Sequence, residues 1–526
     1  MGAGRSEEVG GPVRPELAEL RERKALLGDG ARPEAVAGRH RSGRRTAREN
    51  LADLVDPGSF VEYGGLAIAA QRARRELREL LERTPADGLV GGIGRVNGDR
   101  FGEGAACALL SYDYMVLAGT QGVLGHRKKD RLFELIERLR LPTVIFAEGG
   151  GGRPGDTDYP VVSALDTRAF ALWARISGLA PRIAIVAGRC FAGNALLAGS
   201  ADLIVATEDV ALGMGGPAMV AGGGLGEFEP EEIGPIGVQA ENGVVDLRVA
   251  DEAAAVAATK RLLACFQGPL DDWEAPGPGL ARAVIPESRR RAYDVRAAIE
   301  AIVDVGSAIH LREEFAREMV TALARIEGRP VGVIANNPMR TAGAVTSAGA
   351  DKAARFMQLC DAYAIPILSL IDTPGMMVGP EAEATALVRH CARLFNTGAN
   401  LRVPLVAVIL RKAYGLGAQA MAGGGLHEPL LTLGWPTAEL GAMGLEGAVR
   451  LGLRRELEAI EDPDERERRV REVTDHAHEH AKALNAATIF ELDDVIDPAE
   501  TRRLVAATLA AAPRPDPSPR RPVDAW

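Results

Sequence analysis

The chain contains few cysteines and no long apolar run, and both shortages narrow the class of protein. Its five cysteines among 526 residues are widely spaced, odd in number and without a Cys-x-x-Cys pair, which argues against a disulfide framework or a cysteine zinc site. We expect them to be small buried hydrophobic residues in a reducing cytoplasm. No stretch has the length of a membrane span or the pattern of a signal peptide, so neither is predicted.

Basic clusters and metal-ligand patterns are also scarce. Asp plus Glu outnumber Lys plus Arg by 72 to 62, which gives a formal net charge of -10, and no basic block is long enough for a nucleic-acid surface. His476, His478 and His480 lie in a strongly charged segment, where a solvated helix face explains them better than a metal site. We therefore predict neither a metal ion nor a nucleic-acid partner.

The common nucleotide and hydrolase fingerprints are missing as well. No Gly-x-Gly-x-x-Gly is placed for a dinucleotide, and there is no P-loop and no Gly-x-Ser-x-Gly elbow. We predict no nucleotide on this chain. Aromatic residues make up 4% of the chain, whereas the hydrophobic fraction is 47%. Many small residues of this kind suit an α/β fold, and the length suffices for two or three domains.

What the sequence does contain is an internal repeat. Lys128 to Pro142 and Lys352 to Pro366 both span 14 positions. In each copy an amphipathic helix leads to the proline, a buried strand and a Gly-rich turn, and a second strand and turn follow. Continuous apolar runs of this type are typical of a sheet that is covered on both faces. The predicted strands are Thr143–Ala147, Ile183–Ala187, Ile367–Ile371 and Leu405–Leu410.

Composition divides the chain into four predicted segments. These are a helical or flexible segment at 1–35, an N-terminal domain at 36–270, a C-terminal domain at 271–512 and a flexible tail at 513–526, with a Pro/Gly-rich linker at 268–278. Thr46 and Glu49 have the spacing of a helix capping box. We also predict a charged, solvated helix over 69–83 and helical structure over 296–327.

Four Gly-rich turns carry the chemical signal, each directly after an apolar strand. They are Glu148–Gly152, Phe191–Asn194, Asp372–Gly375 and Tyr414–Gly417. Glycine permits positive φ and close approach of the backbone to a ligand, and the N–H groups at a helix start are free donors. Two such donors can form an oxyanion hole for the enolate of a thioester. The turns could also be ordinary connections, but their matched spacing favours two related ligand sites.

At these residues the chain resembles the carboxyltransferase subunits of biotin-dependent acyl-CoA carboxylases, of the propionyl-CoA and methylcrotonyl-CoA carboxylase β kind. The resemblance runs from about residue 43 to about residue 509, in the family's order. Its most specific motifs are Gly43–Asn50 with Asp56–Glu62, Ala354–Phe356, Asp372–Gly375, Arg411–Gly415, Trp435–Glu439 and Ile496–Arg502.

The resemblance implies two tandem crotonase-like ββα-superhelix domains. The N-terminal domain would bind the acyl-CoA and the C-terminal domain carboxybiotin. The chain has no Met-Lys-Met biotinylation motif and no ATP-binding loop. Biotin is therefore expected on a separate biotin carboxylase or biotin carboxyl carrier subunit. Members of the family form dimer-based oligomers or hexamers, so we expect a homo-oligomer.

The resemblance also implies the site residues. One oxyanion hole would use the N–H groups of Ala192 and Gly193 for the acyl-CoA enolate, and the other those of Leu416 and Gly417 for the biotin ureido oxygen. The expected acyl-CoA contacts are Gly149, Gly150, Gly151, Arg153 and Phe191. The expected biotin contacts are Gly375, Tyr414, Gly415, Ala418 and Gln419. The carboxyl group would pass to the α-carbon, or a vinylogous carbon, of the ester without a side-chain base.

The chain departs from the family pattern in its turns. It has Glu148–Arg153 where Ser-Gly-Gly-Ala-Arg is usual, Phe191–Gly193 for Ala-Gly-Gly, and Gly415–Ala418 for Gly-Gly-Ala-Tyr. Because the donors are backbone groups, these changes alter the acyl pocket rather than remove the holes. Two alternatives stay open: a biotin-dependent decarboxylase of a malonyl-type thioester, and a non-catalytic paralogue that scaffolds a carboxylase complex.

Overall fold

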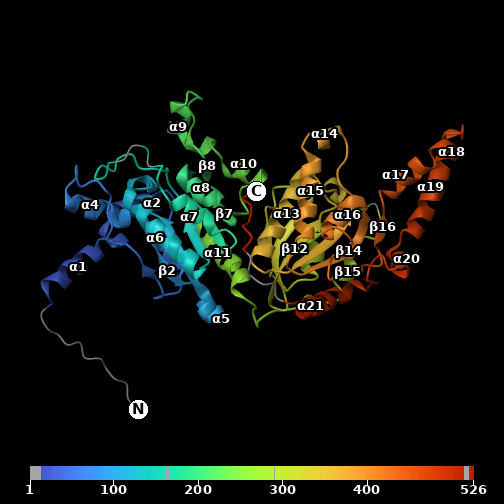
Figure 1. The fold of residues 1–526 in the computed structure, drawn as a ribbon, viewed down its shortest axis with the longest axis horizontal. Coiled ribbons are helices and arrows are strands. Elements are labelled where there is room, and N and C mark those ends of the chain that lie inside the picture. The colour runs from blue at the N-terminus through green and yellow to red at the C-terminus, as the bar shows by residue number, and fades with distance from the viewer. Residues whose placement is uncertain (1–12, 161–162, 164, 290, 514–519) are drawn as a thin grey trace, which may run out of the picture.

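Two similar sheets form the centres of two halves of the chain in the computed structural model (Figure 1). The structure describes residues 13–160, 163, 165–289, 291–513 and 520–526. The first sheet has the order β1-β2-β3-β4-β5-β7-β9 and the second the order β10-β11-β12-β13-β14-β15-β17, with β16 beside β14. In both sheets the first strands are antiparallel and the later ones parallel. The first twelve residues of the predicted 1–35 segment lie outside the described residues.

The strands are mostly short and buried. Those of the N-terminal half are β1 Val61–Glu62, β2 Leu89–Arg95, β3 Ala106–Tyr112, β4 Thr143–Phe146, β5 Arg182–Val186, β6 Arg189–Phe191, β7 Leu203–Thr207, β8 Ala211–Gly213 and β9 Leu247–Val249. Those of the C-terminal half are β10 Ile309–Leu311, β11 Met319–Ile326, β12 Arg329–Asn336, β13 Ile367–Thr373, β14 Leu405–Tyr414, β15 Leu431–Gly434, β16 Glu439–Gly441 and β17 Asp494–Val495.

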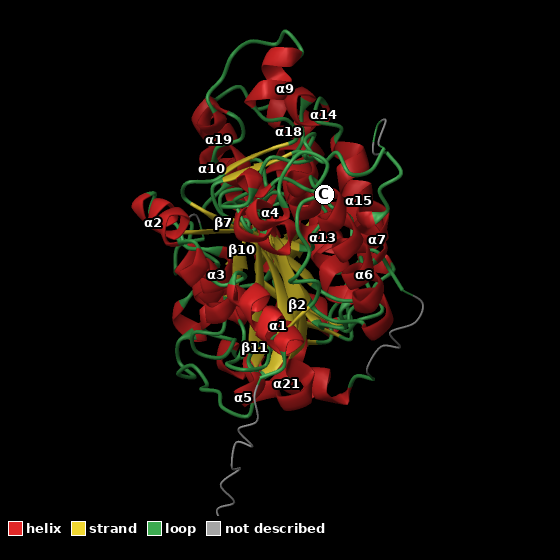
Figure 2. Ribbon diagram, turned by 90° about the vertical axis from the view of Figure 1, so that its left-hand side faces the viewer, coloured by secondary structure: helices red, strands yellow, loops and turns green. Residues whose placement is uncertain are grey.

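Helices cover the two sides of the sheets, as Figure 2 shows. The N-terminal half contains α1 Pro15–Ala25, α2 Pro33–Arg41, α3 Ala47–Leu54, α4 Leu77–Arg83, α5 Gly98–Phe101, α6 Val123–Leu139, α7 Ala169–Arg175, α8 Gly193–Gly199, α9 Pro217–Gly222, α10 Ile236–Glu241 and α11 Glu252–Gln267. The rest are α12 Arg296–Glu300, α13 Ser347–Ala362, α14 Pro380–Glu383, α15 Leu387–Ala399, α16 Gly415–Met421, α17 Leu445–Gly452, α18 Arg454–Glu458, α19 Pro463–His480, α20 Ala483–Thr488 and α21 Thr501–Ala511.

The sequence repeat corresponds to matching elements of the two halves. β4 and β13 each begin one residue after the first proline, and both pair in parallel with the strands on either side. The offset between the copies is 224 positions, from Pro142 to Pro366, and falls to 223 between Pro181 and Pro404. This offset identifies equivalent residues in the two halves.

Two predicted helices are wrong in extent. Within 296–327 only Arg296–Glu300 is helical, and Ile309–Leu311 and Met319–Ile326 are strands. Every residue of β11 is buried, so contacts with β10 and β12 outweigh the helix propensity of its Met, Ala and Leu residues. Within 69–83 the helix covers only Leu77–Arg83. The capping box is confirmed: Thr46 caps α3, and Glu49 bonds back to the backbone N–H of Thr46.

The two halves share an apolar core. Leu263 of α11, Leu323 of β11 and Leu359 of α13 belong to one cluster of buried side chains. Residues 520–526 also join the halves, and the C-terminus lies between them (Figure 1). The backbone of Val523 exchanges two hydrogen bonds with the Ser177 hydroxyl, at 2.9 and 3.1 Å, and Gln358 donates to Asp524. Of the tail predicted at 513–526, residues 514–519 lie outside the described residues, and 520–526 make these contacts.

Candidate active site

The two Gly-rich turns of the N-terminal half meet at the start of α8. The N–H of Gly149 donates to the carbonyl of Arg189 at 2.8 Å, and the carbonyl of Gly149 accepts from Phe191 at 3.0 Å. Gly151 has a φ of 80°, and a Cβ at this position would lie 2.7 Å from the Cβ of Ala192. Glycine is therefore required there. The structure brings Gly149, Gly151, Ala192 and Gly193 together, with Gly150 exposed between the first two.

The turns of the C-terminal half meet in the same way at the start of α16. A Cβ on Gly417 would lie 2.6 Å from the carbonyl carbon of Gly375, so the two glycines are in direct backbone contact. The N–H of Val345 donates to the carbonyl of Gly375 at 3.0 Å. Its equivalent, Gln121, donates to the carbonyl of Gly151 at 2.6 Å. Both halves thus present a helix start held against a glycine turn.

The backbone angles define which donors correspond. Ala192 has a φ of 53° and Gly415 a φ of 54°, and they are 223 positions apart. Ala192 donates its N–H to the carbonyl of Gly213 at 3.2 Å, so this group already has an acceptor. The first turn of an α-helix leaves its N–H groups without helical partners. The N–H groups of Gly193 and Asn194 at the start of α8 therefore correspond to those of Leu416 and Gly417 at the start of α16. We call the first pair the N-terminal hole and the second pair the C-terminal hole.

The predicted donor pair, Ala192 and Gly193, stays a prediction, and the structure adds Asn194 as a candidate. The N–H of Ala192 already has the Gly213 carbonyl as its acceptor, whereas the offset of 223 positions matches Gly193 and Asn194 to Leu416 and Gly417. The sequence analysis does not include Asn194 because it matches the two halves by their glycines, and Ala192 stands where its counterpart, Gly415, is a glycine.

Several predicted contact residues have their side chains engaged elsewhere. The Arg153 side chain is 4% exposed and donates to Asp87 at 2.5 Å and to the carbonyl of Thr120 at 2.9 Å. These bonds tie the residue after the Gly149–Gly152 turn to Asp87 and Thr120. Tyr414 is buried and donates its hydroxyl to Glu439 at 3.0 Å. By contrast, Leu416 is 61% exposed at the C-terminal hole.

The remaining predicted residues lie beside the same helix starts. Phe191 is buried, and its ring contacts the positions of Gly213 and Gly216. Ala418 is buried in the first turn of α16, and Gln419 is exposed one residue later. Gly415, with its positive φ, forms the turn into α16.

A buried carboxylate is the first residue of the first turn in each half. Glu148 accepts two hydrogen bonds from Arg39, both at 2.9 Å, and one from Arg44 at 3.2 Å. Its equivalent, Asp372, accepts from Arg411 at 3.0 Å and from the Tyr293 hydroxyl at 2.9 Å. Burial raises the pKa of both carboxyl groups, and the neighbouring arginines oppose this shift. These ion pairs fix the ends of β4 and β13. Sequence reasoning missed them, since their partners lie far away in the chain.

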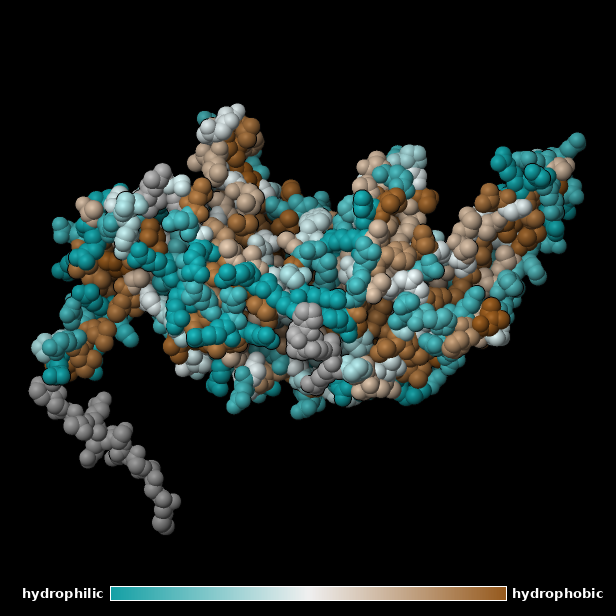
Figure 3. Space-filling model, in the orientation of Figure 1, coloured by the Kyte–Doolittle hydropathy of each residue, from teal (hydrophilic) through white to brown (hydrophobic). Residues whose placement is uncertain are grey.

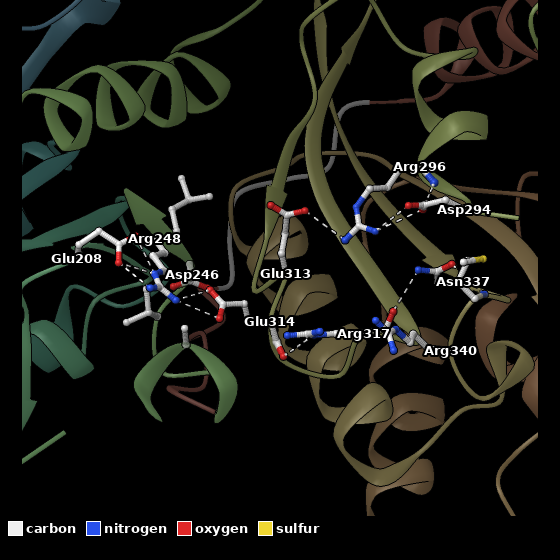
Figure 4. Close-up of a pocket in the computed structure, with 14 residues that line it drawn as sticks. Glu208, Asp246, Arg248, Asp294, Arg296, Glu313, Glu314, Arg317, Asn337 and Arg340 are labelled. Atoms are coloured by element: carbon white, nitrogen blue, oxygen red, sulfur yellow. Dashed lines mark hydrogen bonds and ion pairs between the residues drawn. The ribbon is translucent and has the colours of Figure 1, made fainter. Parts of the chain in front are cut away.

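Each half has a cavity near its turns. One of about 420 Å³ is lined by Arg39, Arg44, Tyr114, Glu148 and Arg189. Another, of about 760 Å³, borders the start of α16 and includes Pro374, Lys412, Tyr414 and Glu439. A third, of about 670 Å³, opens between the halves (Figure 4). There Arg248 pairs with Glu208 and Glu314, and Arg296 with Asp294 and Glu313. Two of the four arginines that line the third cavity, Arg248 and Arg296, are therefore paired with carboxylates.

Comparisons with known proteins decide the family. Residues 38–519 match the model of the carboxyl transferase domain. The chain belongs to the carboxyl transferase family. It is 31% identical over 515 residues to the methylmalonyl-CoA carboxyltransferase 12S subunit of Propionibacterium freudenreichii subsp. shermanii, which covers 94% of this chain and 93% of that one. It is 32% identical over 517 residues to the biotin-dependent long chain acyl-coenzyme A carboxylase beta4 subunit of Mycobacterium tuberculosis, covering 93% and 92%.

Solved structures agree with this assignment. A single-chain, multi-domain long-chain acyl-CoA carboxylase superposes on this carboxyl transferase with a TM-score of 0.90 at 56% identity, over 94% of this chain. This chain spans 49% of that one, about half its length. The transcarboxylase 12S structure, described as a hexamer, gives a TM-score of 0.82 at 29% identity and covers 97% and 98% of the two chains.

The family assignment confirms the central predictions. The crotonase-like α/β fold, the resemblance to acyl-CoA carboxylase carboxyltransferase subunits and the activity class, transfer of a carboxyl group, are all confirmed. The decarboxylase alternative is not favoured. No helix of the described ranges is long and apolar enough to cross a membrane. The same residues contain no group of three or more His, Cys, Asp or Glu side chains that could hold a metal ion. The domain boundaries and individual site residues stay predictions.

Proposed function

We propose that this carboxyl transferase moves a carboxyl group from carboxybiotin, carried by another subunit or domain, to the α-carbon of a long-chain acyl-CoA. The observation that carries the proposal is the pair of equivalent holes, one on each half of the chain. Each consists of N–H groups at a helix start held against a glycine turn. Backbone donors of this kind stabilise a developing oxyanion without a side-chain base.

The N-terminal hole suits the thioester. The N–H of Gly193 lies beside Gly151, where the lack of a side chain lets the two turns pack together. As negative charge moves onto the thioester oxygen, the N–H groups of Gly193 and Asn194 hold it. Loss of one donor from such a hole typically costs about 3 kcal/mol in the barrier.

The C-terminal hole suits the biotin ureido group. Leu416 and Gly417 provide two adjacent N–H groups, and the exposed Leu416 side chain offers an apolar surface next to them. Pro374 and Tyr414, which belong to the two Gly-rich turns of the C-terminal half, line the cavity of about 760 Å³. These residues fit a small uncharged ring with one carbonyl oxygen. When bound, carboxybiotin supplies the carboxyl group as CO2 and a ureido nitrogen that accepts the α-proton.

The role of the chain is to hold the two oxygens in place while the bonds change. The N–H groups of Leu416 and Gly417 donate to the ureido oxygen, and those of Gly193 and Asn194 donate to the thioester oxygen. The α-carbon of the ester, once deprotonated, forms its new bond to CO2. No protein side chain gains or loses a proton in this scheme. Site residues without reactive groups, such as glycine and leucine, are consistent with it.

The substrate class rests on the relatives. Identity is 56% with the long-chain acyl-CoA carboxylase and 29% with the transcarboxylase 12S structure. The altered turns would reshape the acyl pocket, since this chain has Phe191–Gly193 where the family usually has Ala-Gly-Gly. A long acyl chain would need apolar surface near the N-terminal hole. Met214 and Met219, which follow β8, are 66% and 64% exposed.

A second copy of the chain would complete the site. The two holes belong to different halves (Figure 1), and apolar side chains are exposed on projections from both. Figure 3 shows apolar surface on the α9 segment and on the α17–α19 projection. Leu225 is 75% exposed and Leu451 67%. Exposed patches of this kind mark protein interfaces. We propose a homo-oligomer in which the N-terminal half of one subunit faces the C-terminal half of another, and a cytoplasmic location for it.

An acyl-CoA panel tests the proposal. The purified chain, a biotinylated carrier, biotin carboxylase, ATP and labelled bicarbonate are incubated with acetyl-, propionyl- or palmitoyl-CoA. We expect label in the palmitoyl thioester, with kcat/KM at least about tenfold above that for propionyl-CoA, which corresponds to about 1.4 kcal/mol. Absence of label with all three esters, while the carrier itself is carboxylated, would overturn the proposed function. Preference for propionyl-CoA would overturn the substrate class alone.

Mixed oligomers test the shared site. Gly193→Pro and Gly417→Pro each remove one donor, and both variants should be inactive alone. If each site combines halves of two subunits, refolding an equal mixture restores about a quarter of the wild-type sites, because one site in each mixed dimer is intact. Sites contained within one chain would restore no activity.

A further inference from the structure

A buried chain of side chains connects three segments beneath the N-terminal hole. Lys129 of α6 donates to the Gln121 side-chain carbonyl at 2.5 Å. The Gln121 amide donates to Asn194 Oδ1 at 2.5 Å. The Asn194 amide in turn donates to the backbone carbonyls of Glu148 at 2.7 Å and Gly119 at 3.2 Å. All three side chains are almost fully buried, with exposures of 1%, 4% and 0%.

Gln121 contacts both Gly-rich turns of the N-terminal half. Its backbone N–H donates to Gly151, and its carbonyl accepts from Arg153 at 3.0 Å. Its side chain reaches the first turn of α8, where a Cβ on Gly193 would lie 2.9 Å from Gln121 Nε2. The same residue therefore holds the Gly149–Gly152 turn with its backbone and the donor turn with its side chain.

Both ends of the chain fix its direction. Lys129 donates to the Gln121 oxygen, so the Gln121 amide nitrogen faces Asn194. The carbonyls of Glu148 and Gly119 only accept, so the Asn194 amide nitrogen faces them and its oxygen faces Gln121. Without a donor at position 129, the buried Gln121 oxygen would lose the hydrogen bond from Lys129. Gln121 would then be free to move away from Asn194 and from the first turn of α8.

The C-terminal half has none of these groups. The equivalents of Gln121, Lys129 and Asn194 are Val345, Ala353 and Gly417. There Gly417 packs directly on the Gly375 backbone. A hole of this type can thus be supported by backbone contact alone. The N-terminal hole instead carries a side chain, Asn194, within its donor turn, and that side chain needs a defined orientation.

We propose that Lys129 is a positioning residue that holds Gln121 against Asn194 and thereby aligns the donors of the N-terminal hole with the thioester oxygen. The inference deepens the proposed function and rests on it. Lys129 does not touch the ester in this scheme. Its loss should therefore lower kcat and leave the affinity for acyl-CoA unchanged, because misplaced donors weaken the transition state more than the ground state.

Two substitutions at position 129 separate positioning from packing and from charge. Lys129→Met has a similar shape but cannot donate, whereas Lys129→Gln is neutral and can still donate to Gln121. We expect a 10- to 100-fold lower kcat for the Met variant, with KM and the acyl-CoA dissociation constant within about twofold of wild type. The Gln variant should recover most of the loss. Lys128→Met is the matched control, since Lys128 is the adjacent buried lysine and donates to the carbonyl of Ala86 instead.

Each outcome decides the inference. Full kcat in Lys129→Met would show that Lys129 only packs, and equal losses in the Met and Gln variants would show that its charge, not its donor, matters. A comparable kcat loss in Lys128→Met would show a general effect of losing a buried lysine. Any of these results overturns the proposal.

A measurement without turnover keeps this test independent of the proposed function. Hydrogen–deuterium exchange of the peptide that contains α8 should be faster in Lys129→Met than in wild type or Lys129→Gln, whatever reaction the protein catalyses. Unchanged exchange in α8 would refute the positioning role even if the enzyme proved active. Inactivity of the wild type with every ester, together with faster exchange in the variant, would refute the function and leave the positioning role standing.

Discussion

At the scale of single residues, the contact between Gly417 and Gly375 gives a sharp prediction. A methyl group at 417 would lie 2.6 Å from a backbone carbon, so one of the two turns must move. We expect Gly417→Ala to lower kcat about 100-fold, since small misplacements of a donor have effects of that size. Gly199→Ala is the control, because a Cβ there meets nothing within 4 Å. It should keep full activity. Equal activity of both variants in the acyl-CoA assay would contradict the proposed hole.

His126 predicts a loss of stability in acid. Burial lowers its pKa to about 3 from 6.5, and its Nδ1 has no hydrogen-bond partner among the described residues. Below pH 6.5 the His126 imidazole therefore binds a proton in the unfolded chain but stays neutral in the folded chain. The contribution of His126 to the free energy of unfolding, which is complete above pH 6.5, is lost as the pH falls toward 3. At pH 5 the loss is about 2 kcal/mol. Urea unfolding of His126→Gln should lack this component, whereas the exposed His480→Gln should keep it.

At the scale of elements, the capping box offers a test of a motif that the sequence predicted. The Thr46 hydroxyl accepts from the N–H of Glu49 at 3.0 Å and donates to Asp29 at 2.5 Å. Thr46→Ala should lower the free energy of unfolding by about 1 kcal/mol. Thr46→Ser keeps the hydroxyl and should lose much less. If urea denaturation shows equal stabilities for the Ala and Ser variants, the cap contributes nothing.

The elements that could be predicted are those whose pattern is local. The proline-to-strand steps at Pro142 and Pro366 and the Gly-rich turns were visible because each is fixed by neighbours in the chain. β11 was not predicted as a strand because its residues, taken alone, favour a helix. The contacts with β10 and β12 that make it a strand cannot be seen in its own sequence. The support of the holes was missed for the same reason. Asn194 is 73 positions from Gln121 in the sequence, and nothing about Gln121, Lys129 or Asn194 alone indicates a network.

At the scale of the whole molecule, residues 520–526 act as a strap between the two halves. Arg520 donates to the carbonyl of Ser177 at 2.8 Å, and Arg355 of α13 donates to the carbonyl of Asp524 at 3.3 Å. The Trp526 ring lies 5.4 Å from that of Phe315. The strap thus contacts the loop after α7 in one half and several elements of the other. Its contacts add to the shared apolar core and should raise the cooperativity of unfolding.

Disrupting the strap should loosen one half from the other. Val523 is 7% exposed, so Val523→Asp buries an unpaired charge and should lower the stability by a few kcal/mol. Because the two holes are backbone features of separate halves, we expect the folded variant to bind acyl-CoA normally while calorimetry shows a broader or divided unfolding transition. Val305→Asp, at a position that is 54% exposed, controls for the added charge and should unfold like wild type. A sharp transition at the wild-type temperature for Val523→Asp would mean that the apolar core around Leu263 and Leu359 couples the halves without help from the C-terminus.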